Sequence, residues 1–138
     1  METGTFPVST QAPFLSNLNV LDNITLIHDN LHHFTQKSSE ALVLEKLSLL
    51  GLQELARVHH STVNDRELFF LQLIRASIKE DQNIIIDSPF LMVSIEKDVT
   101  FLIEALSVLN LDYKRLLIVD ITSQKHKYKE EFCHIEEC

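Results

Sequence analysis

The segment at residues 71–89, LQLIRASIKEDQNIIIDSP, constrains the fold of this chain more than any other. Its first half has apolar residues at helical spacing, and its second half is a run of three isoleucines that ends at Asp87. β-Branched residues favour extended backbone, and a run that is apolar at every position predicts a strand buried on both faces of a parallel sheet. Asp87 is therefore expected at the carboxyl end of a buried strand, with Ser88 and Pro89 immediately after it.

A second strand of the same kind is predicted at residues 115–119, RLLIV, and Asp120 follows it. Residues 96–110, between the two strands, have the spacing of an amphipathic helix. Strand, helix and strand in this order predict a parallel pair joined by a right-handed crossover, and hence an α/β fold. The helical residues expected to face inward are Val99, Phe101, Leu102, Ala105, Leu106 and Leu109.

The residues before this unit show mainly helical spacing, with cap and stop signals at the ends of each run. Side chains of Asn, Asp and Ser cap helix starts, and glycine ends helices because it adopts left-handed backbone. The expected elements are a helix through Ile27 capped by Asn17 or Asn19, a loop or frayed turn at 28–36, a helix from Ser38 or Ser39 to Gly51, a short turn at 52–58, and a largely buried helix from Asn64 or Asp65 to Lys79.

No linker or internal repeat divides the sequence, so we predict a single domain over residues 1–138. A short strand is expected at residues 6–10, where Pro7 places it at a sheet edge or at a strand start. Residues 88–94 are expected to form a loop. Residues 19–80 would form a helical lobe, residues 6–11 and 82–121 the α/β core, and residues 122–138 a surface helix or loose tail.

The charge and the apolar content exclude some classes of function. The formal net charge of −8 argues against a nucleic-acid partner, because such proteins carry basic patches. No apolar run reaches the roughly 20 residues of a membrane-spanning helix, and the start lacks the pattern of a secretory signal. We therefore expect a cytoplasmic chain. Its two cysteines, Cys133 and Cys138, predict no disulfide framework.

Several segments in a fixed order resemble motifs of the ATP-binding cassette (ABC) ATPases, the motor subunits of membrane transporters. The resemblance covers residues 6–120 and implies a partial P-loop NTPase core, ABC ATPase-like, with a small parallel sheet and a helical subdomain. The matching segments are Thr10-Gln11 with Pro13-Phe14 for the glutamine loop, LNVLDNI at 18–24 for the helix after it, LSLLGLQEL at 47–55, LIRA at 73–76 for the helix after the signature motif, and IIIDSP at 84–89 for the Walker B strand.

The resemblance also identifies where the sequence departs from the chemistry of that family. The signature motif falls on residues 63–67, where Asp65 replaces a glycine and brings a carboxylate to a phosphate-binding position. The catalytic glutamate falls on Ser88, and a hydroxyl is a far poorer base than a carboxylate. The aspartate of the D-loop falls near Ser94, and the switch histidine falls on Ile121.

A phosphate-binding loop needs glycines, and neither Gly4 nor Gly51 has that context. The resemblance therefore implies a truncated family member that lacks the phosphate loop and its strand. The strand at residues 115–119 would then be an apolar sheet edge with unpaired backbone groups. Either the tail at residues 122–138 covers that edge, or another chain supplies the missing pairing.

Together these departures predict a catalytically inactive protein that binds a transporter component as a scaffold or regulator. The implied partner is a transmembrane subunit or an intact ABC ATPase, in a homo- or hetero-oligomer, and residues 14–30 are the best-matching docking region. Gln11 and Asp87 are residual cofactor-binding positions, but no catalytic residue, bound cofactor or metal is predicted. The expected location is the cytoplasm, with the inner face of the membrane as the place of docking.

Other readings stay open at this point. A weak nucleotidase could bind Mg-ATP through Asp87 and complete its site with a partner chain. His126, Cys133, His134 and Cys138 could supply zinc ligands, although their spacing also fits a flexible terminus with reduced thiols. The pairs His32-His33 and His59-His60 are expected to diverge and to be loop residues, and Arg75 is expected to be a structural ion-pair partner. A decayed gene remnant is a further possibility.

Overall fold

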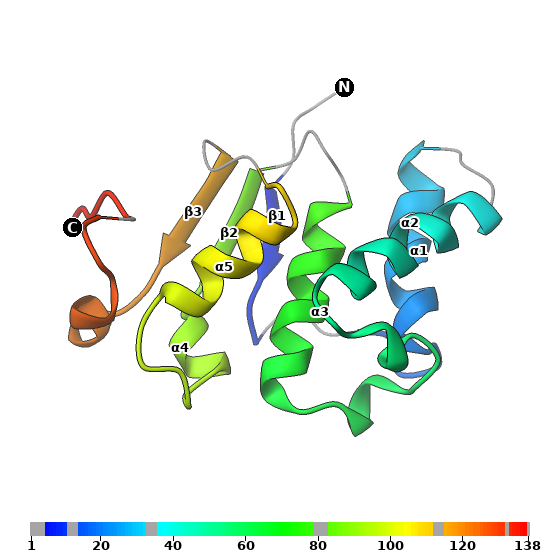
Figure 1. Ribbon diagram of the computed structural model, residues 1–138, viewed down its shortest axis with the longest axis horizontal. Helices are drawn as coiled ribbons and strands as arrows, with labels where there is room; N and C mark the ends of the chain where they lie inside the picture. The colour runs from blue at the N-terminus through cyan, green and yellow to red at the C-terminus, as the bar shows by residue number, and fades with distance from the viewer. Residues whose placement is uncertain are drawn as a thin grey trace.

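The computed structural model describes residues 5–10, 14–32, 36–78, 83–111, 115–131 and 133–137. Its described strands are β1 (Thr5–Val8), β2 (Asn83–Asp87) and β3 (Leu116–Val119), which form a parallel sheet in the order β1-β2-β3. The predictions of an α/β fold and of two parallel strands that end at Asp87 and just before Asp120 are confirmed. The strand with Pro7, predicted at a sheet edge or at a strand start, lies at an edge. Figure 1 shows the sheet at one side of the molecule and the helices α1 and α2 at the other.

The strand β2 lies at the centre of the sheet, and the sheet is packed mainly on one face. Ile84 and Ile86 are buried, whereas Ile85 between them is only half-buried. On β3, Leu117 is 57% exposed and Val119 is 48% exposed. Burial on both faces of the sheet was therefore a wrong prediction, because an apolar run does not state how many layers of the protein pack against it. We call the face that carries Ile85, Leu117 and Val119 the open face.

The helices α1 (Val20–His32) and α2 (Gln36–Leu49) form the outer part of the helical lobe. Asn19 caps α1, because its side-chain oxygen accepts the N–H of Asp22 at 2.8 Å. Gly51 has φ +70° and ends α2, with the N–H of Leu52 bonded back to the carbonyl of Leu47 at 2.8 Å. The helix α1 continues to His32, so the loop predicted from residue 28 was wrong there. No glycine or proline stops the backbone between residues 28 and 32.

The helix α3 (Asp65–Ser77) packs between this lobe and β1. Asn64 caps it and forms a capping box with Glu67, so of the two predicted caps, Asn64 and Asp65, the first is the cap. Residues 69–77 are all buried, which confirms the prediction of a largely buried helix. Two short 3₁₀ turns, η1 (Gln53–Leu55) and η2 (His60–Thr62), connect α2 to α3.

The segment after β2 differs from the sequence prediction at its helix boundaries. Residues 89–92 form a single helical turn, α4 (Pro89–Met92), where a loop was predicted, and proline suits the first position of such a turn. The helix α5 runs only over Thr100–Val108, although residues 96–110 were predicted. It begins late because the carboxylate of Asp98 accepts the N–H of Thr100 at 2.8 Å, and Asn110 with φ 54° ends it. The six residues predicted to face inward are all buried.

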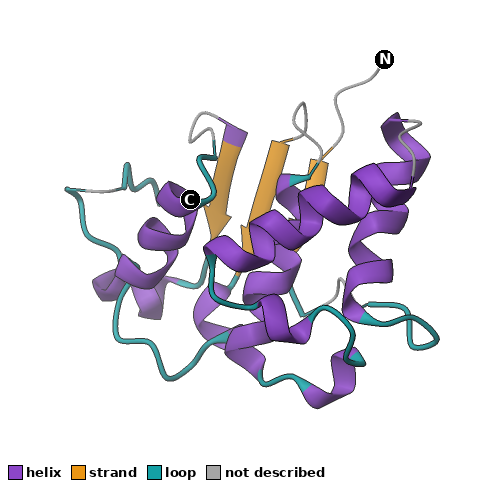
Figure 2. Cartoon of the chain, turned by 45° about the vertical axis from the view of Figure 1, so that its right-hand side comes forward, coloured by secondary structure: helices purple, strands orange, loops and turns teal. Residues whose placement is uncertain are grey.

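The described tail begins with the 3₁₀ helix η4 (Thr122–Lys127) and packs against α4 and the start of α5. The Tyr128 ring lies edge-on to Phe90, with ring centroids 5.4 Å apart, and the N–H of Val99 donates to the carbonyl of Lys127 at 2.9 Å. Figure 2 shows the strands behind the layer of helices. Among the described residues, none of the helices is both long and apolar enough to cross a bilayer.

Candidate functional site

Two acids stand at the carboxyl ends of neighbouring parallel strands. Asp87 is exposed at the end of β2, and its carboxylate accepts the hydroxyl of Ser88 at 2.9 Å. Asp120, after β3, accepts the Tyr128 hydroxyl at 2.7 Å and the N–H of Ile121 at 2.8 Å. The carboxylate of Asp87 is therefore the more open of the two toward solvent.

Ser88 has an unusual backbone conformation for a residue other than glycine. Its φ and ψ are 52° and 58°, in the left-handed region, and its N–H donates to the carbonyl of Val119 at 2.7 Å. This turn ends β2 and directs the chain into α4. Left-handed backbone costs a non-glycine residue about 1–2 kcal/mol, and such strain is often found at functional sites.

Asp87 is the one predicted cofactor-binding position whose surroundings are described. Gln11 lies outside the described residues. Ser94 and Ile121 are both exposed, in the loop after α4 and directly after Asp120. Within the described part of the chain, no three His, Cys, Asp or Glu side chains gather closely enough to hold a metal ion.

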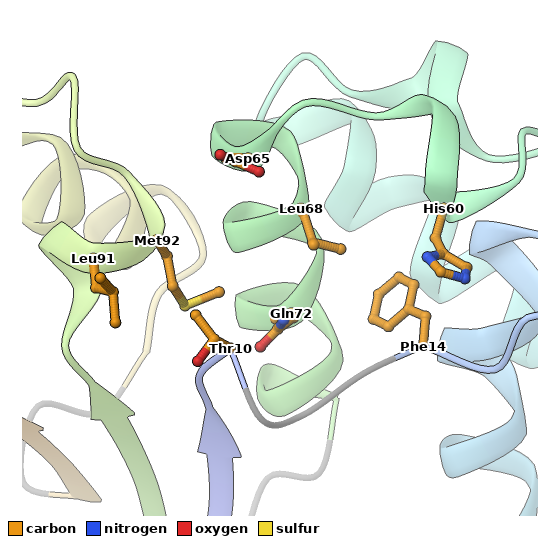
Figure 3. Close-up of a pocket in the computed structure, with 8 residues that line it drawn as sticks. All are labelled: Thr10, Phe14, His60, Asp65, Leu68, Gln72, Leu91 and Met92. Atoms are coloured by element: carbon orange, nitrogen blue, oxygen red, sulfur yellow. The ribbon is translucent and has the colours of Figure 1, made fainter.

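A cleft of about 290 Å³ opens between the end of β1, one side of α3 and the turn α4. Figure 3 shows its lining side chains, with Met92 extending toward those of α3. The α3 residues Asp65, Leu68 and Gln72 line it from one side of that helix. The complete lining is Thr10, Phe14, His60, Asp65, Leu68, Gln72, Leu91 and Met92.

Two buried hydrogen-bonding side chains fix the walls of this cleft. Gln72 is buried, and its side-chain oxygen accepts the N–H of Ser9 at 3.0 Å, which holds the end of β1 against α3. Asn23 on α1 is also buried and bonds the loop before that helix at four points. It accepts the N–H of Leu15 at 2.6 Å and donates to the carbonyls of Leu15, Leu18 and Asn19.

The Phe14 ring at the end of the cleft contacts two nitrogen-bearing side chains. The Arg75 guanidinium lies 4.5 Å from the ring centroid, and the His60 ring packs edge-on at 6.2 Å. Burial lowers the pKa of Arg75 to about 10, so it remains charged at neutral pH. Arg75 does not line the cleft, and its cation–π contact with Phe14 gives it a structural position.

The pair His59-His60 was predicted to diverge, and this was wrong, because the two rings stack with centroids 4.6 Å apart. They lie where a 3₁₀ turn begins and not within an α-helix, so helical geometry does not separate them. His59 bonds the Ser61 hydroxyl at 2.7 Å and the carbonyl oxygen of Ser16. It therefore ties the loop before α1 to the connection before α3.

The described cysteine and histidines of the tail, which were candidate zinc ligands, do not gather into a metal site. Cys133 is half-buried, and burial raises the pKa of its thiol. His134 is exposed and lies 3.2 Å from Glu136, and His126 is exposed as well. Cys138 lies outside the described residues.

Comparison with known proteins places the fold. No family model matches the sequence, and no curated protein matches it. A solved structure does match: a transporter assigned to the metal-chelate ABC type, in an inward-facing conformation, at 17% identity with a TM-score of 0.57. The match covers 86% of this chain and 48% of that chain, so this chain spans about half the length of the one it resembles. The ABC-like fold expected from the sequence is thereby confirmed, at the level of fold.

Proposed function

We propose that this protein is an ABC ATPase-like subunit that binds a transporter component and does not hydrolyse ATP. Its role would be that of a scaffold or regulator, and its partner would be a transmembrane subunit or an intact ABC ATPase. The proposal rests mainly on one contact, between Ser88 and Asp87. The position that should carry the catalytic glutamate carries a hydroxyl, and that hydroxyl donates to Asp87 instead of accepting a proton from water.

The start of α3 supports the same conclusion. A helix start binds phosphate through its free N–H groups. Here the N–H of Glu67 donates to the Asn64 side chain at 2.8 Å, and the carboxylate of Asp65 adds a negative charge to an exposed position. At this helix start, a nucleotide phosphate would meet an N–H group that is already hydrogen-bonded and a carboxylate of like charge.

The cleft supports binding of a protein partner. In the ABC family, which the sequence resembles, the groove between the helical lobe and the core receives a helix from the transmembrane subunit. The cleft at Phe14 has apolar lining from Leu68 and Met92, and Leu91 at its mouth is 71% exposed. Grooves of this kind accept the apolar face of an amphipathic helix. The bonds of Asn23 hold the neighbouring loop in place before a partner arrives, which lowers the entropy cost of docking.

Titration calorimetry with Mg-ATP and an ATPase assay test the catalytic half of the proposal. We expect no heat of binding up to millimolar nucleotide and no turnover above buffer, with an intact ABC ATPase as the positive control. Turnover that disappears in Asp87→Asn would refute the proposal. It would favour a weak nucleotidase that uses Asp87 as its magnesium ligand.

Pull-down from membranes tests the binding half. The tagged chain should recover a transporter permease or ATPase. Leu91→Asp, at the mouth of the cleft, should lower recovery at least tenfold. Ile95→Asp is the matched control, because Ile95 is 82% exposed and does not line the cleft. Recovery of no transporter subunit would contradict the proposed role.

A further inference from the structure

The sheet has two unlike edges. The edge strand β1 contains Pro7, which has no N–H, and proline is one of the devices that blunt an edge strand against pairing. The edge strand β3 has the sequence LLIV, with no proline and no charge. Among the described residues, no backbone hydrogen bond reaches β3 except from β2 and from Ser88. The described tail packs on α4 and α5 and leaves this edge unpaired.

The backbone groups that face outward from β3 can be identified. The carbonyl of Val119 accepts the N–H of Ser88, so the backbone of Val119 faces β2. Successive strand residues direct their N–H and C=O groups to opposite edges. Leu116, Ile118 and Asp120 therefore direct theirs away from the sheet.

The side chains beside this edge are apolar and exposed. Leu117 and Val119 lie on the open face, and Ile121, two residues further along, is 62% exposed. An apolar edge strand with free donors and acceptors is a template for another strand. The occupant that fits it should be short, apolar and uncharged, and it should present a free edge of its own.

We propose that the occupant is a second copy of this chain, joined by antiparallel pairing of β3 with β3 about a two-fold axis at Ile118. β3 of the second copy has the required length, composition and free edge. Parallel pairing of two β3 strands would need a two-fold axis along the strands, which would set each N–H against the same N–H of the other copy. The pairing must therefore be antiparallel. With the axis at Ile118, all three outward-facing residues form backbone hydrogen bonds. Ile118 pairs with Ile118 of the other copy, and Leu116 of each copy pairs with Asp120 of the other.

This register also brings the exposed side chains together. On the open face, Leu117 of each copy lies opposite Val119 of the other, which gives two such pairs. Ile121 of each copy lies opposite Arg115 of the other. The basic end of each strand at Arg115 adjoins the acidic end of its partner at Asp120. The contact is limited mainly to one strand per copy. Because interfaces below about 1,200 Å² are usually weak, we expect dissociation constants on the order of tens of micromolar.

Sedimentation velocity over a range of concentrations tests the proposal, with circular dichroism to check folding. The wild type should dimerise, and Leu117→Lys combined with Val119→Lys should weaken dimerisation at least tenfold, because lysines would meet across both pairs. This variant reduces the magnitude of the net negative charge from −8 to −6, so general repulsion between copies falls and cannot explain the loss. Ile95→Lys, at a more exposed apolar residue outside the edge, should dimerise as the wild type does.

A charge-swap experiment tests the register. Leu117→Glu combined with Val119→Glu should also be monomeric, and mixing it with the double-lysine variant should restore a mixed dimer. In the wild type, the Ile118 amide should exchange with solvent deuterium more slowly as concentration rises. A wild type that stays monomeric at about 200 µM, or a dimer that the double-lysine variant leaves intact, would overturn the proposal. So would a monomer with a protected Ile118 amide, since the edge would then be covered by its own chain.

Discussion

Removing the cap of α3 should destabilise the whole domain by a measurable amount. The Asn64 side chain accepts the N–H of Glu67 at 2.8 Å, and the Glu67 carboxylate accepts the N–H of Asn64 at 3.0 Å. Asn64→Ala removes the first bond and leaves no cavity, because the residue is exposed. The expected loss is about 1 kcal/mol of unfolding free energy, which corresponds to a melting temperature lower by about 4 °C for a domain of this size. The loss should be global, since residues 69–77 of α3 are buried in the core.

Urea unfolding followed by circular dichroism at 222 nm measures this loss, as the chain has no tryptophan. A double-mutant cycle of Asn64→Ala with Glu67→Ala should give a coupling energy of about 0.5 kcal/mol or more, because the two bonds form one reciprocal unit. Asn17→Ala, at an exposed asparagine outside the helices, is the control and should change stability by less than about 0.5 kcal/mol. Equal losses at residues 17 and 64, or zero coupling, would refute the capping argument.

Two further changes test other parts of the fold. Gly51→Ala should cost about 1–2 kcal/mol, because its φ of +70° strains a residue with a Cβ although no atom within 4 Å would clash with it. Ser48→Ala, in the helix that Gly51 ends, should cost nothing, and equal urea midpoints for both variants would contradict this. Burial and the bond to Asp120 raise the pKa of Tyr128 above its usual value near 10. The unfolded chain therefore releases this proton first, so stability should fall as the pH rises above 10. Tyr128→Phe should be less stable by about 1 kcal/mol at pH 7 and should lose that part of the pH dependence; an unchanged slope would show that Tyr128 is not its source.

The sequence predicts the elements of the core well because their signals are local. The isoleucines before Asp87 mark β2, and Asn64 with Glu67 three residues later marks the start of α3. The predicted helix at residues 96–110 was too long because its first residues have helical composition. A side-chain bond from Asp98 to the backbone of Thr100 delays the helix, and composition does not reveal that bond.

The candidate site was predictable only in part. The acids at the ends of β2 and β3 could be placed, because parallel strands bring their carboxyl ends to one side of a sheet. The bond between Ser9 and Gln72 could not, since it joins residues 63 positions apart. The role of Asn23 had one local signal, an asparagine on the expected apolar side of a helix, between Leu21 and Ile24. The stacking of Arg75 on Phe14 had none, because it depends on how the loop before α1 meets α3.

The proline in β1 also sets the stoichiometry of any assembly built on this sheet. A sheet with two open edges can add copies at both ends and grow into a filament without limit. Among the described strands, Pro7 leaves β3 as the edge strand with an N–H at every residue, so the valence of this sheet for strand pairing would be one. Two such copies consume both of their available edges when they meet. Replacing Pro7 with a residue that has an N–H would raise that valence to two and convert a closed pair into a polymerising unit.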